Sequence, residues 1–536
     1  MIEVEYESPE IDEEEAKMQQ LRSKATELLL REEWKESIHA YSNLISLCQN
    51  HLLKLHQEKL QKSLCLAYSN RAEARFRLRE YAAALNDCEE ALKIESAHFK
   101  TLLCKGKILF NLNRYGVALD CFRAANLDPQ ASSSSETLND YLDRCKKLEF
   151  FSRTGSFDLS DWILNGFRGK MPELAEYIGG VEIKKSEISG RGLFATKNID
   201  SGTLLLVTKA IATERGIFSP GDSGENAQML MWKNFIHKVI ESARRCSITK
   251  NLIRLLSTGE NENDSVVPEI DLFRPEAEDS CISNHDLDVE QLSSILDVNS
   301  FVEGAISGKV LGENSRYYGV GLWLLASFIN HSCEPNVRRL HIGDHLLIHA
   351  SRDIKAGEEL TFAYFDVFQP LRNRKDMVEI WGFSCSCRRC KFEEGLCHKE
   401  EMGEVAMVLG KGLDMGAFVY KLEEGMKRWL VRGKGKGYLR ASFWEAYAEA
   451  FGSERSVRRW GRRIPPIETL VDSVVDAVGS DERVVKLLMK GLKRSGKVGG
   501  GVMEMERAMK LGRGIYGKVM KRQALRTLLQ PGTHDS

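Results

Sequence analysis

Apolar residues recur at helical spacing from about residue 17 to about residue 150, and part of this pattern repeats. Five pairs of identical or similarly small residues are 34 positions apart: Leu78 and Leu112, Tyr81 and Tyr115, Ala84 and Ala118, Ala91 and Ala125, Ala72 and Gly106. An earlier, looser unit contains Ala25, Trp34 and Tyr41. Small residues at fixed positions allow two helices to approach closely, so the pattern predicts three stacked helical hairpins, followed by a capping helix at about 136–150.

The period of 34 residues and these residue types resemble tetratricopeptide (TPR) repeats. This resemblance implies that the stack binds partner proteins. TPR domains that hold a C-terminal carboxylate use a clamp of basic residues and asparagine, which three residues match: Arg22, Asn70 and Lys100. Thr26 and Cys104 depart from the clamp. We therefore favour a structural stack with polar inner residues over a site for a chaperone tail.

Near residue 180 the pattern changes to short apolar or alternating runs, which predict strands. The runs lie at 181–184, 202–213, 345–350 and 358–364. An insertion at 216–298 separates the first two from the last two, and its first part, near 226–257, has helical spacing. From Gly259 to Glu290 it carries eleven acids and one base. That charge favours a solvated loop, and a docking surface for basic substrates is the alternative.

Periodic segments after residue 399 predict a C-terminal helical domain with breaks at Gly433–Gly437 and Gly499–Gly501. Between Lys427 and Arg463, eleven basic residues outnumber three acids, and aromatic residues lie among them. A basic and aromatic segment can bind nucleic acid. The aromatic residues are helically spaced, however, which favours an amphipathic helical region with a solvated basic face. Nucleic acid is therefore not an expected partner.

The charges of the whole chain balance, with 76 basic and 77 acidic residues. A net charge of −1 gives no drive towards nucleic acid or an anionic membrane. No apolar run is long enough for a membrane span, and residues 3–15 carry eight acids and no base, unlike a secretory signal. Thirteen cysteines are unevenly placed, with four between Cys385 and Cys397. This distribution predicts a reducing compartment, the nucleus or cytoplasm, and a local metal site.

Four motifs carry the candidate chemistry. They are Gly190-Arg191-Gly192-Leu193, Asn330-His331-Ser332-Cys333-Glu334-Pro335-Asn336, Gly357-Glu358-Glu359-Leu360-Thr361-Phe362-Ala363-Tyr364 and Cys385-x-Cys387-x-x-Cys390. In this order they resemble a SET-domain protein methyltransferase of the SET-and-MYND (SMYD) branch, over about residues 180–395. Asn299-Ser300-Phe301 matches a further segment of that branch. The insertion holds only Cys246 and Cys281, too few for a MYND zinc module. We therefore expect a TPR–SET protein without MYND.

Cys385, Cys387 and Cys390 lie within six residues, so their thiolates can converge on one ion. A closed structural zinc site needs a fourth ligand, and the resemblance implies that Cys333 supplies it. The alternative for Cys333 is a small buried side chain without a metal. Bound zinc would tie the tail to the Asn330–Cys333 loop and hold Phe383 over the cofactor pocket.

The cofactor that the resemblance implies is S-adenosyl-L-methionine. The residues implied for its binding are Arg191, Gly192, Leu193, Asn299, Asn330, His331, Tyr364 and Phe383. A loop with two glycines permits close approach of the backbone to a ligand, and Phe383 offers an apolar face to adenine. The alternative for Asn330 and His331 is a turn held by side-chain hydrogen bonds.

Tyr364 is the candidate catalytic residue, because it ends the Gly-Glu-Glu-Leu-Thr strand and its hydroxyl can orient a substrate amine. A lysine amine must lose a proton before it attacks a methyl group, and burial in an apolar channel favours that loss. The leading hypothesis is a protein-lysine N-methyltransferase, with a histone or non-histone substrate. The alternative is a TPR adaptor whose SET fold is inactive.

The expected fold is a multidomain α+β chain: an N-terminal α-solenoid, a β-rich SET fold with a zinc knuckle, and a C-terminal α-helical region. The predicted divisions are an acidic tail at 1–16, TPR-like repeats at 17–150, SET segments at 176–215 and 299–367 around the insertion at 216–298, a zinc-binding segment at 368–398 and the helical domain at 399–536.

Overall fold

The computed structural model describes residues 9–52, 58–166, 169–217, 224–259, 266–275, 288–303, 317–397, 414–494 and 502–528. The chain divides into two compact units. One contains residues 1–153 with 244–247, and the other contains 154–243 and 248–536. Among the described helices, none combines the length and apolar character that crossing a membrane requires.

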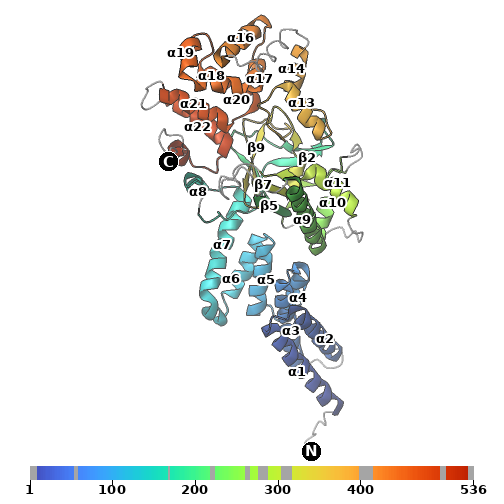
Figure 1. Cartoon of the computed structure of the whole chain (residues 1–536). Helices are drawn as coiled ribbons and strands as arrows, with labels where there is room; N and C mark the ends of the chain where they lie inside the picture. Colours follow the sequence, from blue (N-terminus) through green and yellow to red (C-terminus); the bar gives the residue numbers. More distant parts are fainter. Residues whose placement is uncertain are drawn as a thin grey trace, which may run out of the picture. The chain divides into compact units, whose positions relative to one another are not determined.

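The first unit is an array of antiparallel helical hairpins of the TPR type (Figure 1). Its helices are α1 (Pro9–Leu30), α2 (Trp34–Leu52), α3 (Glu58–Arg77), α4 (Tyr81–Ile94), α5 (Phe99–Asn111), α6 (Tyr115–Ala125) and α7 (Ser135–Thr154). Each helix from α1 to α5 packs on the next. The ring of Tyr141 on α7 stacks on Phe122 of α6, with centroids 4.9 Å apart, so the predicted capping helix covers the end of the array.

The predicted period of 34 residues is confirmed in the hairpin geometry. Helices α4 and α6 begin at Tyr81 and Tyr115, and the turns before them use Arg79 and Asn113, both with a φ of 61°. The five alanines of the repeat are fully buried. A Cβ atom on Gly106 would lie 2.6 Å from the Phe122 ring, which explains why the smallest residue stands where α5 and α6 approach.

The residues compared with a carboxylate clamp differ in burial and in contacts. The Asn70 amide donates to the Tyr41 hydroxyl at 2.9 Å, Cys104 is buried, and Arg22 and Lys100 are exposed. Asp87, fully buried, instead accepts hydrogen bonds from two arginines of α3, Arg71 and Arg75. These ion pairs compensate the buried charge of Asp87 within the array. The preference for a structural stack over a site for a chaperone tail stays a prediction.

The second unit contains small sheets joined by long connections. Its strands are β1 (Tyr177–Ile178), β2 (Val181–Lys185), β3 (Arg191–Ala195), β4 (Leu204–Lys209), β5 (Ala212–Ile217), β6 (Phe301–Val302), β7 (Tyr317–Leu322), β8 (Asn330–His331), β9 (Val337–Ile342), β10 (His345–Ala350) and β11 (Thr361–Phe362). The described strands form a four-stranded sheet in the order β1-β4-β10-β9, a three-stranded sheet in the order β5-β7-β6, and the pairs β2-β3 and β8-β11. The pair β8-β11 is parallel and aligns Asn330 with Thr361 and His331 with Phe362.

One apolar core joins these sheets to the helices of the insertion. Helices α9 (Gly224–Arg245), α10 (Ser247–Arg254) and α11 (Val289–Asn299) surround it, and Phe235, Ile295 and Trp323 are fully buried within it. The helical part of the insertion is therefore part of the fold. Most of the acidic stretch of the insertion lies outside the described residues. The unit also contains the short helix α8 (Ser160–Leu164) and the 3₁₀ segment Ile270–Phe273.

The C-terminal region is helical and packs on the strand region (Figure 1). Its described helices are α13 (Leu371–Ile380), α14 (Arg388–Cys397), α16 (Met415–Arg428), α17 (Lys434–Ser442), α18 (Trp444–Gly452), α19 (Glu454–Trp460), α20 (Ile467–Val478), α21 (Glu482–Arg494), α22 (Val502–Tyr516) and α23 (Arg522–Leu528). The aromatic residues of the basic segment are buried: Tyr438, Phe443, Trp444, Tyr447 and Trp460. This burial confirms the aromatic core of the amphipathic interpretation.

The predicted break at Gly433–Gly437 is wrong beyond its first residue. Only Gly433 has a positive φ, of 53°, and α17 begins immediately after it. A Cβ atom on Gly437 would lie 2.0 Å from the backbone oxygen of Ser473 on α20. Glycine in α17 therefore allows close helix packing. Further along the chain, Gly517, whose φ is 75°, lies between the end of α22 and the start of α23.

Two buried histidines predict acid sensitivity of the second unit. His341 on β9 and His349 on β10 are each 2% exposed, and burial lowers the pKa of His341 to about 3 and that of His349 to about 4. Their unfolded pKa is about 6.5, so their stabilising contribution is complete above pH 6.5 and is lost as the pH falls towards 4. We expect the free energy of unfolding to fall by about 1.4 kcal/mol per pH unit for each histidine in that range.

Urea unfolding between about pH 7 and about pH 4.5 measures this dependence. His349 lies 3.2 Å from the carbonyl oxygen of Gly514 on α22, so His349→Gln keeps a donor and removes the titration. The variant should show a shallower dependence on pH. His237→Gln is the control, because that histidine on α9 has a 70% exposed side chain. Equal slopes for wild type and His349→Gln would contradict the prediction.

Candidate active site and metal centre

Asn330 connects the two halves of the predicted cofactor site. Its amide nitrogen lies 3.1 Å from the carbonyl oxygen of Arg191, 3.2 Å from that of Ser189 and 2.8 Å from Oε1 of Glu359. Ser186 donates to the same carboxylate at 2.8 Å. The Asn330 side chain thus holds the Ser186–Arg191 loop in place, as the turn interpretation expected, and it does so next to the Gly-Arg-Gly motif.

Glycine is required at position 192, because the Glu359 side chain lies very close to the backbone there. A Cβ atom there would lie 2.4 Å from a carboxylate oxygen of Glu359. Burial raises the pKa of Glu359, while hydrogen bonds from Asn330 and Ser186 act in the opposite direction. Leu193 continues the motif into β3, where its carbonyl oxygen accepts from the Leu360 amide at 2.7 Å. The first, second and third motifs therefore meet at one place.

His331 and Tyr364 are brought together by the parallel pair β8-β11. The backbone amide of Tyr364 donates to Nδ1 of His331 at 3.1 Å, and the Tyr364 hydroxyl donates to the carbonyl oxygen of Ile329 at 3.1 Å. His331 also stacks on Phe365, with centroids 4.6 Å apart. The side chain of Tyr364 is thereby fixed by hydrogen bonds at both its backbone and its hydroxyl.

Aromatic rings surround Tyr364. Their centroids lie 5.3 Å away for Phe362, 5.3 Å for Trp381 and 6.1 Å for Phe383. Burial raises the pKa of Tyr364, so the phenol stays protonated at neutral pH. Phe383 is half-buried and also lies 5.5 Å from the His331 ring. This contact places the tail residue Phe383 beside the Asn330–Cys333 loop.

Two of the predicted cofactor residues have other contacts. The Asn299 amide donates to the carbonyl oxygens of Ser257 and Ile295, at 2.8 and 2.7 Å, and so joins α11 to the end of α10. The Arg191 guanidinium donates to the Val266 carbonyl oxygen at 3.1 Å and lies 5.3 Å from the Phe328 ring. Their part in cofactor binding stays a prediction.

The four predicted metal ligands form one cluster. The sulfur atoms of Cys333, Cys385, Cys387 and Cys390 all lie within 4.8 Å of one another. A tetrahedral zinc with Zn–S bonds of about 2.3 Å needs sulfur atoms about 3.8 Å apart, so the cluster fits that ion. Hydrogen bonding among the thiols, from Cys333 first, lowers the pKa of Cys387 to about 7. The donor set and its spacing suit structural zinc.

Charged residues for which the sequence predicted no role lie next to the cysteine cluster. Arg374 on α13 is 1% exposed, and its guanidinium lies 3.2 Å from the Cys390 sulfur and 2.6 Å from Glu393. Arg389 lies 2.9 Å from the same glutamate and donates to the Cys333 carbonyl oxygen at 3.1 Å. A guanidinium beside thiolates offsets the negative charge that four cysteine ligands bring to one zinc. Ser442 on α17 completes the network.

The sequence model of the SET domain family matches residues 190–365, which span three of the four motifs. Residues 190–365 form a SET domain. Asn330, His331 and Tyr364 lie within this SET domain, and Phe383 and the three tail cysteines follow it.

The chain is similar to a Gibberella zeae protein named Methyltransferase, with 27% identity over 383 residues, which are 67% of this chain and 49% of that protein. It is similar to Histone-lysine N-methyltransferase SMYD3 of Homo sapiens, with 43% identity over 77 residues, 14% of this chain and 18% of that protein. The chain thus spans about half of the first relative and less than a fifth of the second.

Among solved structures, the TPR2B-domain:pHsp70 complex of yeast Sti1 has a TM-score of 0.21 and 18% identity, over 25% of this chain and 98% of that chain. The N-terminal helical array, the SET domain and the C-terminal helices all lie in this one chain.

Three further residues belong to the site although no sequence pattern predicted a role for them: Glu359, Phe365 and Trp381. Glu359 is part of the Gly-Glu-Glu-Leu-Thr motif, and this position is the sequence feature that could have identified it as a site residue. Phe365 follows Tyr364 directly, so only the fold shows that its ring turns onto His331. Trp381 precedes the tail cysteines and has no recognisable pattern of its own.

Proposed function

We propose that this protein is an S-adenosylmethionine-dependent protein-lysine N-methyltransferase whose TPR-type array binds partner proteins. The observation that carries the proposal is the junction of three segments: the Gly-Arg-Gly loop, Asn330-His331 and Tyr364. The SET domain and the methyltransferase relatives support the reaction class. The choice of lysine rests on the resemblance to the SMYD branch and on the chemistry of the aromatic site.

The residues present suit the proposed cofactor. The Gly190–Leu193 segment would meet it through backbone groups, with Asn330 holding that loop, and Phe383 would face the adenine ring. The rest of the cofactor site would be formed by His331, Tyr364 and Arg191. When bound, S-adenosylmethionine supplies an electrophilic methyl group on a sulfonium.

Tyr364 would orient the substrate amine in this mechanism. Its hydroxyl hydrogen is directed at the Ile329 carbonyl oxygen, so the lone pairs of the phenol oxygen remain for an N–H of the amine. A phenol with a raised pKa acts as a neutral hydrogen-bond partner and not as a base. The rings of Phe362, Trp381 and Phe383 would give the amine an apolar environment, and such desolvation lowers the pKa of a lysine amine. Positioning accounts for much of the remaining acceleration.

The test is incubation of the purified chain with methyl-labelled S-adenosylmethionine and a lysine-peptide array. We expect label on lysine-containing peptides and none on matched peptides with arginine in place of lysine. Label on another residue type would keep the cofactor site and overturn the lysine assignment. Cofactor binding without transfer to any peptide or protein tested would instead support the TPR adaptor with an inactive SET fold.

A further inference from the structure

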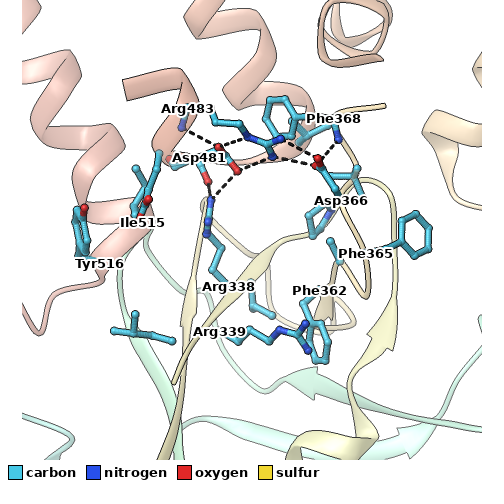
Figure 2. A pocket seen from close by; sticks show the side chains of 18 of the residues that line it. Arg338, Arg339, Phe362, Phe365, Asp366, Phe368, Asp481, Arg483, Ile515 and Tyr516 are labelled. Carbon is cyan, nitrogen blue, oxygen red and sulfur yellow. Dashed lines mark hydrogen bonds and ion pairs between the residues drawn. The ribbon is translucent and has the colours of Figure 1, made fainter. Parts of the chain in front are cut away.

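A pocket of about 440 Å³ adjoins Tyr364. Its lining includes both neighbours of that residue, Ala363 and Phe365, with Phe362 and strand β9 beside them. The opposite wall comes from the C-terminal helices, around the start of α21 and the end of α22 (Figure 2). The pocket thus lies between the SET strands and the C-terminal helices, and one of its lining rings, Phe362, packs on Tyr364.

Most of the charged side chains in the pocket are paired with each other. Arg483 donates to both oxygens of Asp366, each at 2.9 Å, and to Asp481 at 2.9 Å. Arg338 lies 3.5 Å from Asp481 and donates to the Ser480 carbonyl oxygen. This network joins the SET domain to the C-terminal helices and leaves these charges mutually compensated.

Arg339 is different, although it lies next to Arg338 on β9. Figure 2 shows its guanidinium beside the Phe362 ring, apart from the paired network. The guanidinium carbon lies 5.1 Å from that ring and 5.6 Å from the Phe301 ring. Within the described ranges, no carboxylate is within ion-pair distance of it. Burial lowers the pKa of Arg339 to about 10, so it remains a cation at neutral pH.

The remaining acidic residue of the lining is Glu482, at the start of α21. Within the described residues it forms no ion pair with Arg339. The aromatic rings stabilise the face of the guanidinium, but they do not satisfy its N–H donors. A half-buried cation with free donors in a pocket is complementary to a carboxylate, which it can bind through two parallel hydrogen bonds.

We propose that this pocket binds an acidic side chain of the protein substrate on Arg339, next to the residue that is methylated at Tyr364. This inference rests on the proposed methyltransferase function. The Phe362 ring lies 5.1 Å from the Arg339 guanidinium and 5.3 Å from the Tyr364 ring, so the guanidinium and the Tyr364 ring are no more than about 10 Å apart. An extended chain advances about 3.3 Å per residue, so the acid is about two or three residues from the target lysine.

The test uses lysine peptides in pairs that differ only by glutamate or glutamine at one position, for each of the four positions on either side of lysine. For wild type we expect one position at which glutamate raises kcat/KM by about ten- to a hundredfold, the range for a hydrogen bond to a charged group. Arg339→Met, which keeps an apolar stem against the rings, should reduce that ratio to about one. Arg339→Lys should retain part of the glutamate preference, because lysine keeps the positive charge but cannot form the two parallel hydrogen bonds of a guanidinium.

Arg338→Met is the matched control, because it removes an adjacent arginine whose charge is already paired. Its glutamate-to-glutamine ratio should equal that of wild type, even if its stability falls. Methyl transfer with no preference at any position, or a preference that survives in Arg339→Met, would overturn this proposal and leave the methyltransferase function standing. If no transfer occurs, tighter direct binding of one glutamate peptide than of its glutamine partner, lost in Arg339→Met, would still support the acidic site.

Discussion

Replacement of Tyr364 by phenylalanine is expected to abolish most methyl transfer while cofactor binding is retained. The variant keeps the ring that packs on Phe362, Trp381 and Phe383, and it removes only the hydroxyl that would orient the amine. Turnover should fall by about ten- to a thousandfold, a change in barrier of about 1.4–4 kcal/mol. Because the Gly190–Leu193 loop, Asn330 and Phe383 are untouched, the cofactor Kd should change little. Single-turnover kinetics with labelled cofactor, together with calorimetric binding, separate the two effects.

Loss of the hydroxyl also leaves the Ile329 carbonyl without its partner, which costs about 1 kcal/mol of stability. Tyr447→Phe is the matched control for this effect. Tyr447 is fully buried in the C-terminal helices, and its hydroxyl donates to Glu423 at 2.6 Å. That variant should lose comparable or greater stability with unchanged turnover. An active Tyr364→Phe enzyme would show that Tyr364 only packs in the core and that its assignment here is wrong.

Removal of one cysteine from the cluster is expected to have the largest effect on stability. Purified protein should contain close to one zinc per chain, and Cys387→Ser should contain almost none, because three thiolates no longer close the tetrahedron. Structural zinc sites bind with apparent free energies on the order of 10 kcal/mol in small domains. We expect the melting temperature of the second unit to fall by about 10 °C or more, with loss of cofactor binding as Phe383 becomes displaced.

Elemental analysis and thermal melts of wild type, Cys387→Ser and Cys246→Ser provide the measurement. Cys246 is a half-exposed cysteine outside the cluster, so its replacement should leave both zinc content and melting temperature unchanged. Wild-type protein with no zinc would exclude the metal centre and leave the position of Phe383 to packing alone. Zinc that persists in Cys387→Ser would point to ligands elsewhere, among which Cys65, Glu95 and His98 form a second close group.

The sequence by itself determined features that depend on spacing along the chain. The offset of 34 residues predicted the hairpins because each repeat must bury the same small residues against its neighbour. The Cys385-x-Cys387-x-x-Cys390 spacing predicted converging sulfur atoms because six residues cannot separate them far. The four motifs in order predicted a SET domain, since each of them supplies context for the others.

Only the tertiary structure decided interactions between residues far apart in sequence, because no local pattern encodes them. The Asn330 amide holds a loop that lies about 140 residues earlier, and Arg374 supports the cysteines from another helix. Gly437 has a helical backbone that propensity alone disfavours, because α20 packs against it too closely for a side chain. Arg338 and Arg339 are adjacent in the sequence, yet the C-terminal helices bring a carboxylate to Arg338 alone. That difference between two neighbouring arginines arises from packing, and it turns a strand residue into a candidate substrate contact.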